Sequence, residues 1–568
     1  MQIVCLKINN FRGIKHLECF FNKPLVCLAG RGDSGKTTIL EAISYVLSGS
    51  RSIDFYDNDF YNADINKPIE IEATIKDFPK EFLQEDKFGL YIRKFDGESI
   101  SDVITEDDNI EENIVLSINL KVDSSLEPIW SVITNRPQQE PKIIYWSDRV
   151  KIRAFMLNDY QDRHFSWAKG SPLQAWLQQY GTEISSNNAI VQAIREVKKQ
   201  IDNISFDHLR DIEEDLINEV ALFGLKLSSA KTTIDFKDIA IKEGRLCFHE
   251  NNIPFRLKGK GSKRLLSIAV QMLLVKKGAI AIIDEVEQGL EPDRIKQLIR
   301  TLKNNNCGQI FLSTHSPSVI EELPCEDIDM VQKKENAAHS ISSCSVSQQG
   351  LIRSCPAALY AEKIIVCEGA TEVGLCRAID RYMQQKNSCG FSAKNAFYID
   401  ANGQSKVGEK AEMLKSFQKL VSVLCDSDVK ELNDKKANLI QQGVAVWDCE
   451  QNKCFEKQLI DDSSPKNLEK IFRFLVSLKQ KYDVVSHDKA ESILWNDIKK
   501  NRNISKDFTV EEAKNALLDF MLSKPKNLRV KSVEYGEGLG DIICKNIEAY
   551  AGTRTRKNIE DLINWVKK

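Results

Sequence analysis

The stretch "GRGDSGKTT", residues 30–38, decides the fold of the amino-terminal part of this chain. It follows a short apolar run, "PLVCLA" (24–29), and precedes "ILEAISYVL" (39–47), whose apolar residues have helical spacing. A glycine-rich turn between a strand and a helix predicts a phosphate-binding loop, because its backbone N–H groups can surround phosphate oxygens. A turn that binds nothing is the less common alternative in this context. We therefore expect ATP to bind at Gly30, Asp33, Ser34, Gly35, Lys36, Thr37 and Thr38, with Lys36 on the terminal phosphates and Thr37 on Mg²⁺.

The composition limits the classes of protein to consider. With 568 residues the chain is too long for one hydrophobic core and is expected to form several domains. Its 79 Lys and Arg against 82 Asp and Glu give a net charge of -3, so a nucleic acid would have to be met by local basic patches. The 15 cysteines form no repeated CxxC frame, and no apolar run is long enough for a membrane helix. These features predict a soluble, cytoplasmic protein with no membrane partner.

Two later apolar runs end in residues that suit ATP hydrolysis. "AIIDEVEQGL" (281–290) predicts a buried strand ending at Asp284, which can hold the Mg²⁺ shell, and Glu285, which can polarise the attacking water. "QIFLSTHSP" (309–317) predicts a strand ending at His315. Alone, such a histidine is more often a hydrogen-bonding residue at a strand end. After a phosphate-binding loop and an Asp-Glu strand, a contact to the γ-phosphate or the water is favoured.

The segment "LKGKGSKRLLSIAVQMLL" (257–274) has a glycine-rich turn before a helix, so that Gly261 and Ser262 can present N–H groups to a nucleotide. Together with "INNFRGI" (8–14), these motifs resemble the ATP-binding-cassette (ABC) ATPases of the SMC and RecF kind. The resemblance implies ATP held between the phosphate-binding loop of one subunit and the signature turn of its partner, and so a dimer. The signature departs from the family pattern, since Ser262 stands where glutamine is common.

The region between the phosphate-binding loop and the signature changes character. Residues 70–155 alternate as strands do, with "IEIEATI", "FGLYIRKF" and "NIVLSINLKV" as the clearest runs. From Ser171 the apolar spacing is helical, which predicts an inserted arm over residues 166–225. The arm is either a lid on its own domain or a dimerisation surface, and it is too short for the coiled coil of an SMC protein. The apolar positions are Val191, Ile194, Val197, Ile201, Leu209, Ile212, Leu216 and Val220.

Four carboxylates follow apolar runs in the second half of the chain. "IIVCEGATEVG" (364–374) contains Glu368 and Glu372, and "VLCDSDVK" (423–430) ends in Asp426 and Asp428. Parallel strands that end side by side would bring these groups to one sheet edge. Such a cluster repels itself unless cations share it, which predicts two divalent metal ions, Mg²⁺ or Mn²⁺, held by oxygen ligands. Two such ions can stabilise both oxygens of a phosphodiester displacement.

An isolated Asp-x-Asp more often caps a helix, but the combination with Glu-Gly-x-Thr-Glu and with Gly403 in "YIDANGQ" (398–404) is specific. It resembles the TOPRIM fold of primases, topoisomerases and some nucleases. An ABC-type ATPase followed by TOPRIM resembles the OLD (overcoming lysogenization defect) family of ATP-dependent nucleases. That family includes the nuclease of Gabija-type anti-phage systems and some retron effectors.

The OLD resemblance implies further roles. One more acidic ligand is expected, with Glu456 preferred and Glu450 as the substitute, and a lysine beside the scissile phosphate, for which Lys531 and Lys557 both stay open. The expected catalytic residues are Glu285, His315, Glu368, Asp426 and Asp428; the expected metal ligands are Thr37, Asp284, Glu368, Glu372, Asp426, Asp428 and Glu456. The expected partners are DNA, further copies of the chain, and a second defence component such as a helicase or a retron RNA–DNA.

The predicted fold class is α/β, with an ABC-type ATPase domain over 1–165 and 226–355, the helical arm over 166–225, and a TOPRIM domain over 356–568. Other functions stay open beside a DNA endonuclease. A topoisomerase would need a tyrosine nucleophile and further DNA-gate domains. A RecF- or SMC-like repair ATPase, or an ATP-driven sensor, would carry a TOPRIM domain that does not cleave.

Overall fold

The computed structural model describes residues 1–103, 113–152, 154–157, 165, 172–173, 176, 207–227, 230–235, 245–304, 308–333, 338–386, 389–417, 419–428, 430–483, 486–489, 491–492, 510–522 and 531–568. The chain forms two compact units, Met1–Pro356 and Ala357–Lys568. Within the described residues, every helix is too short or too polar to cross a membrane.

An antiparallel sheet forms one layer of the first unit. Its strands follow the order β2-β1-β4-β7-β5-β6, and β8 and β9 extend it from β7. The alternating pattern of the sequence is the cause, because one face of each strand is buried. "FGLYIRKF" differs from the expectation, since Gly89–Tyr91 is a 3-10 turn and only Arg93–Phe95 is a strand. The strands are β1 Gln2–Phe11, β2 Ile14–Phe20, β4 Ile69–Lys76, β5 Arg93–Phe95, β6 Ile100–Ser101, β7 Ile114–Val122, β8 Pro128–Ile133 and β9 Lys142–Ile143.

A second sheet carries the phosphate-binding loop. Its order is β10-β14-β15-β3-β16-β17, and all pairs are parallel except β16 with β17. β3, β14 and β15 are buried throughout, as expected for a sheet covered on both faces. Their carboxyl ends therefore bring three distant segments to one edge. The strands are β3 Leu25–Ala29, β10 Ala154–Leu157, β14 Ile280–Ile283, β15 Gln309–Thr314, β16 Ile328–Lys333 and β17 His339–Ser343.

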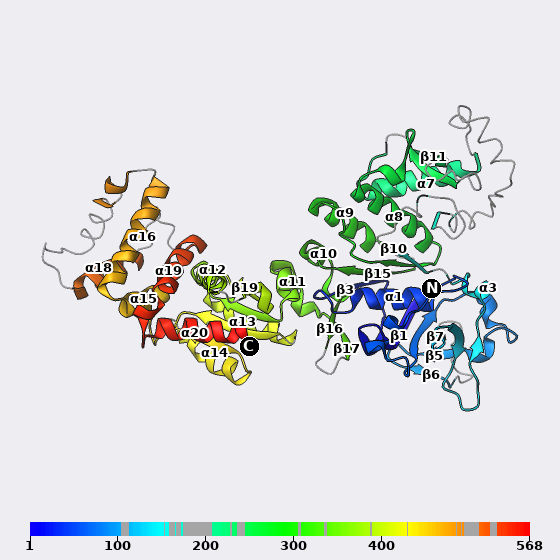
Figure 1. Cartoon of the computed structure of the whole chain (residues 1–568), viewed down its shortest axis with the longest axis horizontal. Helices are drawn as coiled ribbons and strands as arrows, with labels where there is room; N and C mark the ends of the chain where they lie inside the picture. Colours follow the sequence, from blue (N-terminus) through cyan, green and yellow to red (C-terminus); the bar gives the residue numbers. More distant parts are fainter. Residues whose placement is uncertain are drawn as a thin grey trace. The chain divides into compact units, whose positions relative to one another are not determined.

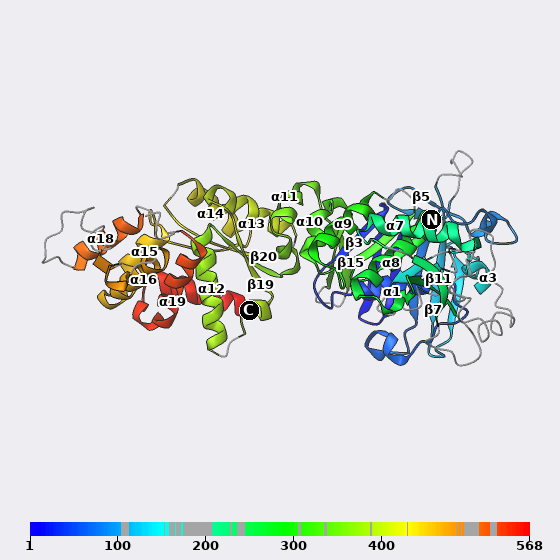
Figure 2. The same cartoon turned by 90° about the horizontal axis from the view of Figure 1, so that it is seen from above.

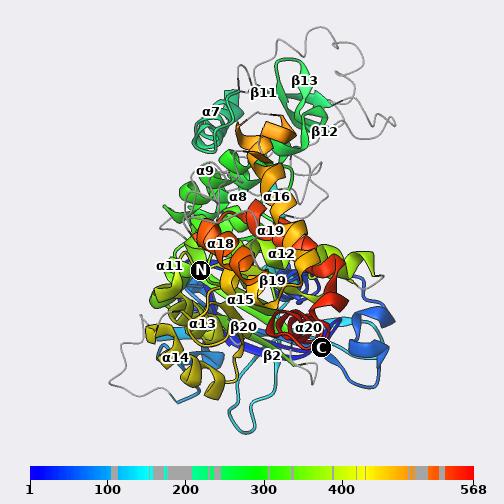
Figure 3. The same ribbon diagram turned by 90° about the vertical axis from the view of Figure 1, so that its left-hand side faces the viewer.

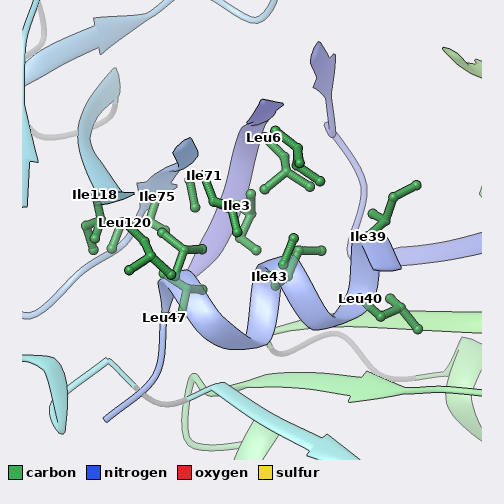
Figure 4. Packing of buried hydrophobic residues seen from close by; sticks show 14 of the residues in the cluster. Ile3, Leu6, Ile39, Leu40, Ile43, Leu47, Ile71, Ile75, Ile118 and Leu120 are labelled. Atoms are coloured by element: carbon green, nitrogen blue, oxygen red, sulfur yellow. The ribbon is translucent and has the colours of Figure 1, made fainter. Parts of the chain in front are cut away.

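Helix α1, Lys36–Val46, lies between the two sheets. Ile39, Leu40 and Ile43 of α1, with Leu47 beyond its end, pack among side chains of β1, β4 and β7 (Figure 4). The same core includes Ile282 and other residues of the parallel sheet. Packing on both sides fixes the start of α1, and with it the phosphate-binding loop.

Helices α8 (Lys260–Val275), α9 (Pro292–Lys303) and α10 (Pro317–Glu322) lie on the face of the parallel sheet opposite α1 (Figure 1). Two short helices, α3 (Trp146–Arg149) and α11 (Gln349–Ser354), also belong to this unit. The predicted arm lies mostly outside the described residues. Its described part includes α7, Asp207–Leu222, whose Leu209, Ile212, Leu216 and Val220 are buried as their spacing predicts. A small antiparallel sheet that the sequence did not predict follows: β11 Ala230–Asp235, β12 Arg245–Glu250 and β13 Ile253–Pro254.

The second unit has a four-stranded parallel sheet in the order β19-β18-β20-β21. Helices α13 and α14 cover one face, and α12 and α20 the other (Figure 2 and Figure 3). β18 is the central partner of both β19 and β20, so the segments after these strands meet at one edge. The strands are β18 Lys363–Cys367, β19 Ala396–Asp400, β20 Leu420–Cys425 and β21 Ala445–Asp448; the helices are α12 Ala370–Gln385, α13 Val407–Ser416, α14 Lys430–Gln441 and α20 Arg554–Lys567.

The remaining described helices of this unit pack on α12 and α20 around a second hydrophobic core. Helix α19 approaches α12 very closely, because glycines face the contact. A Cβ at Gly536 would lie 2.0 Å from the carbonyl oxygen of Thr371, and one at Gly374 would lie 2.2 Å from that of Val533. This close approach sets the position of the residues just before α19. The helices are α15 Phe455–Asp462, α16 Pro465–Asp483, α18 Val510–Leu522 and α19 Val533–Lys545.

Candidate nucleotide site and carboxylate centre

The phosphate-binding loop ends at Gly35, which caps α1 in a left-handed conformation with φ 94°. Lys36 is buried, and its Nζ donates to the carbonyl oxygens of Gly30 (2.9 Å) and Arg31 (2.7 Å) and to Ser34 Oγ (3.3 Å). Burial lowers the pKa of Lys36 to about 8, although nearby carboxylates oppose the change. A phosphate group would stabilise the charged form of this lysine.

The expected Mg²⁺ ligands of this site come together. Asp284 follows β14, and its Oδ1 accepts hydrogen bonds from Thr37 Oγ1 (3.2 Å) and Ser313 Oγ (2.5 Å). Glu285 is exposed, has the unusual φ of 46°, and donates its N–H to Ser313 Oγ (2.8 Å). The hydroxyl of Ser313 therefore links both acidic residues. Of the other predicted residues, Asp33 is exposed with φ 60° and Thr38 is half-buried in α1.

His315 follows β15 at the same edge, and Glu287 orients this turn. The backbone N–H of His315 donates to Glu287 Oε1 (2.7 Å), and Thr314 Oγ1 donates to Glu287 Oε2 (2.9 Å). Burial, and then the charge of Lys36, lowers the pKa of His315, so the imidazole is neutral near pH 7. Glu287 was not predicted as a site residue, although it lies two residues after the predicted Glu285.

Gly261 and Ser262 lie in the first turn of α8, after the N-cap Gly259, and not in a loop before the helix as expected. Their N–H groups belong to the helix start, where backbone donors have no partner within the helix. A Cβ at Gly261 would lie 2.6 Å from the carbonyl oxygen of Gly289. Arg264 donates to the carbonyl oxygens of Asp284 and Glu285. The start of α8 is therefore tied to the acidic turn of its own chain.

The second site forms where β18 and β20 end. Glu368 follows β18 directly and Asp426 follows β20, its parallel neighbour. The N–H of Asp426 donates to Glu368 Oε2 (2.9 Å), and the N–H of Gly403 donates to the Glu368 carbonyl oxygen (3.0 Å). The strand ends thus bring together residues 58 positions apart.

Burial and mutual repulsion perturb these carboxyl groups. Burial, and then the carboxylates of Glu368 and Glu456, raises the pKa of Asp426 to about 7. The pKa of Glu372 is raised well above its usual range by burial and by the charge of Asp426. Glu372 also accepts the N–H of Gly369 (2.9 Å) and so caps α12. Burial chiefly raises the pKa of Glu368 as well. Burial and mutual repulsion therefore outweigh the positive charge that Lys531 supplies to the cluster.

The other acidic residues differ in burial. Asp428 is exposed, and its Oδ1 accepts a long hydrogen bond from Gln404 Nε2 (3.4 Å). Glu456, in the first turn of α15, is only 1% exposed, and its Oε1 has no hydrogen-bond partner. Glu450 instead faces solvent and pairs with Lys453 (2.7 Å). Of the two alternatives for an additional ligand, the fold places Glu456 in the cluster.

The two candidate lysines also separate. Lys531 lies just before α19 with φ 66°. Burial lowers the pKa of Lys531, but the carboxylates of Glu456 and Asp426 outweigh this effect and raise it. Lys557 lies in the first turn of α20, and the side chains of both lysines are exposed. The close contact of α19 with α12 therefore brings Lys531 within electrostatic reach of the cluster.

The side chains of this cluster have the chemistry of a metal site, although they are not yet arranged as one. In the described part of the chain, no group of three or more His, Cys, Asp or Glu side chains is already arranged to hold a metal. Nevertheless, Glu456 has a buried oxygen without a partner, and Asp426 and Glu372 have raised pKa values. Oxygen donors in that state suit a hard divalent cation.

Three residues near the cluster were not predicted. Asp448 ends β21 as Glu368 and Asp426 end their strands, and this shared pattern could have identified it. Lys436 and Arg554 both pair with Asp448. Arg554 begins the basic run "RTRK" (554–557), but it pairs with Asp448, and Arg556 pairs with Glu548 and Glu560. The run is thus largely neutralised within its own unit.

Family profiles match both units of the chain. The profile of a family described as "AAA domain, putative AbiEii toxin, Type IV TA system" matches residues 25–321, which is more than half of the chain. The chain belongs to this family. A second profile, "Overcoming lysogenization defect protein-like, TOPRIM domain", matches residues 359–428. The chain therefore has the OLD-family architecture, an α/β ABC-type ATPase domain followed by a TOPRIM domain, and these two domains indicate a hydrolase.

The relatives are distant. Septu protein PtuA of Bacillus mycoides is 23% identical over 61% of this chain and 42% of its own length. An ATP/GTP phosphatase of Helicobacter pylori is 24% identical over 60% of this chain and 90% of its own. DNA replication and repair protein RecF of Oenococcus oeni is 24% identical over 59% of this chain and 98% of its own length. Among solved structures, an SMC head bound to the winged-helix domain of ScpA covers 62% of this chain and 100% of its own, at 14% identity and a TM-score of 0.39.

Proposed function

We propose that this chain is an ATP-dependent DNA endonuclease in which the ATPase domain regulates phosphodiester cleavage by the TOPRIM domain. The observation that carries the proposal is the adjacency of Glu368 and Asp426 at the ends of neighbouring parallel strands, with the Asp426 N–H on the Glu368 carboxylate (2.9 Å). Glu372 and Glu456 add buried negative charge beside them. A buried acidic cluster of this kind can hold the divalent cations that phosphodiester cleavage uses.

The roles at the carboxylate centre divide as follows. Glu368, Glu372, Asp426, Asp428 and Glu456 would hold Mg²⁺ or Mn²⁺ as the acidic donor set. Bound cations would polarise the scissile phosphate and activate the attacking water. Lys531 would stabilise negative charge on the phosphate, since its ammonium group already lies in the field of Glu456 and Asp426.

The roles at the nucleotide site follow the same logic. Thr37 and Asp284 would hold the Mg²⁺ of ATP, because their oxygens are already 3.2 Å apart. Glu285 would orient the attacking water, and His315, neutral near pH 7, can hydrogen-bond to the γ-phosphate or the water. Gly261 and Ser262, at the start of α8, would contact a nucleotide held by a second copy of the chain.

The partners of this function are DNA and further copies of the chain. A dimer supplies the second side of each nucleotide site, and the region 166–225 is either a lid on its own domain or the dimerisation surface. The similarity to Septu protein PtuA supports a role in anti-phage defence, with a second defence component as a further partner. The similarity to RecF proteins supports DNA as the ligand of the ATPase domain.

One observation favours a second candidate, an ATP-driven sensor whose TOPRIM domain does not cleave. The described residues hold no preformed group of three metal-ligating side chains. A topoisomerase has less support. Of the three tyrosines after Lys430, Tyr535 and Tyr550 are fully buried, and Tyr482 is hydrogen-bonded to Glu534.

The test measures DNA cleavage and ATP hydrolysis in the same preparation. Supercoiled and linear DNA are incubated with the wild-type protein, Mg²⁺ or Mn²⁺, and a series of ATP concentrations. We expect Asp426→Asn and Lys531→Met to abolish cleavage while ATP hydrolysis continues, and Lys557→Met, on an exposed lysine, to cleave normally. Cleavage by Asp426→Asn at the wild-type rate would refute the nuclease assignment and favour a sensor.

A further inference from the structure

Behind the loop that carries Asp426 and Asp428 lies a buried lysine that the proposed chemistry does not use. Lys436 is on α14 and is 7% exposed. Its Nζ donates to the carbonyl oxygen of Asp426 (2.9 Å), to Ser427 Oγ (2.8 Å) and to Asp448 Oδ2 (2.9 Å). The three protons of the ammonium group thus meet three acceptors. Two of the acceptors belong to the loop itself.

The counter-ion of Lys436 is Asp448, which lies outside the loop. Asp448 Oδ1 accepts from Arg554 Nη2 (2.5 Å), and its carbonyl oxygen accepts from Arg554 Nε (3.0 Å) and Asn558 Nδ2 (2.8 Å). Arg554 and Asn558 both lie on α20. A chain of contacts therefore connects α20, through Asp448 and Lys436, to the backbone of Asp426.

Lys436 holds the loop through its backbone and through Ser427, and not through the acidic side chains of the cluster. Asp426 is fixed through its N–H by Glu368, through its Oδ1 by the N–H of Phe455 (2.8 Å), and through its carbonyl oxygen by Lys436. Because the charge of Lys436 is balanced by Asp448, it neutralises neither Asp426 nor Asp428 directly. The loop can be rigid while its acidic side chains stay available to cations.

We propose that Lys436 is a positioning residue of the nuclease centre, and that Asp448 and helix α20 hold it in place. The inference rests on the proposed nuclease function and deepens it. Loss of the Lys436 contacts would release the Asp426 carbonyl oxygen and Ser427, so that Asp426 and Asp428 are no longer held in one arrangement. A displacement of about 1 Å in such groups is enough to lower a catalytic rate about 100-fold.

The test separates positioning from general stability. Lys436→Met should lower kcat for DNA cleavage about 10- to 100-fold, with an unchanged KM for DNA and unchanged ATP hydrolysis. The control is Lys435→Met, on the neighbouring exposed lysine of α14, which should cleave like the wild type. Asp448→Asn should lower kcat similarly, and the double variant should lose no more than the larger single loss, because the two residues act as one unit.

Arg554→Gln provides a second route if Lys436→Met does not fold, because the Arg554 side chain is one-third exposed. It should lower kcat about 3- to 10-fold, whereas Arg556→Gln, which pairs with the exposed Glu548 and Glu560 and not with Asp448, should not. A wild-type kcat in Lys436→Met would overturn the inference. If Lys436→Met does not fold, a wild-type kcat in Arg554→Gln would overturn it instead. Fully additive losses in the double variant of Lys436→Met and Asp448→Asn would also overturn it. A wild-type protein that leaves DNA intact would overturn the proposed function itself.

Discussion

Asp426→Asn should stabilise the metal-free TOPRIM unit at alkaline pH even though it removes a proposed catalytic group. Burial and two neighbouring carboxylates raise the pKa of Asp426 from 3.8 to about 7 in the folded protein. The ionised form is therefore unfavourable in the fold. Asparagine has the same shape, and its Oδ1 can still accept the N–H of Phe455.

The sign and size of the change in the free energy of unfolding follow from the difference between the folded and unfolded pKa of Asp426. Between pH 4 and 7 the folded protein binds a proton that the unfolded chain has released, so the free energy of unfolding falls as pH rises through this window. A difference of about three pKa units corresponds to about 4 kcal/mol at pH 8. Replacing a charged acceptor by a neutral one at the Phe455 N–H weakens that bond by about 1 kcal/mol. The net gain expected for Asp426→Asn at pH 8 is thus about 2–3 kcal/mol.

The assay is hydrogen exchange of β18 and β20 peptides, followed by mass spectrometry across a urea series in EDTA. Comparing both proteins at the same pH removes the intrinsic pH dependence of exchange. The free energies of unfolding of Asp426→Asn and wild type should differ by about 3 kcal/mol less at pH 5 than at pH 8. This change corresponds to two pKa units of titration. Equal stability of both proteins at pH 8, or a difference that does not change with pH, would refute the reasoning.

Two further predictions concern other parts of the chain. Glu285→Gln should bind ATP but hydrolyse it at least about 100-fold more slowly, whereas Lys36→Ala should lose ATP binding, because only the latter change removes a phosphate contact. Equilibrium binding measures the affinity for ATP, and phosphate release measures hydrolysis. Hydrolysis at the wild-type rate by Glu285→Gln would contradict the assignment. Gly536→Ala should destabilise the second unit by about 1–3 kcal/mol or more, since its Cβ would lie 2.0 Å from the Thr371 carbonyl oxygen. The matched control is Gly408→Ala, whose Cβ would meet only Lys435 at 3.5 Å, and denaturant unfolding of both would show whether the helix contact is as tight as described.

The parts of the fold that could be predicted depend on local patterns. Consecutive residues determine the strand-loop-helix order around Gly35. They also determine the buried runs before Asp284, Glu368 and Asp426, and each run forms the expected strand. Parallel pairing then places the residues after such strands at one edge. The adjacency of Glu368 and Asp426 follows from this rule without knowledge of the loops between them.

The remaining features depend on contacts between distant residues. The pairing of Lys436 with Asp448, and of Asp448 with Arg554, joins three elements whose sequences give no sign of one another. The choice between Lys531 and Lys557 was open because it depends on the close approach of α19 to α12, which Gly374 and Gly536 permit. The start of α8 at Lys260 was misplaced because glycines normally disfavour a helix, whereas here the backbone of Gly289 leaves no room for a side chain at position 261.

The charge balance of the TOPRIM unit connects its stability to its proposed chemistry. Asp426, Glu372 and Glu368 all have raised pKa values, and burial is the first cause for each. Without metal, protons are the counter-ions of this cluster, because Lys436 is committed to Asp448 and Lys531 supplies a single positive charge. A divalent cation would have to displace those protons, so cation binding to the cluster is favoured as pH rises toward 8. The same repulsion that destabilises the metal-free fold is therefore what makes these carboxylates strong ligands.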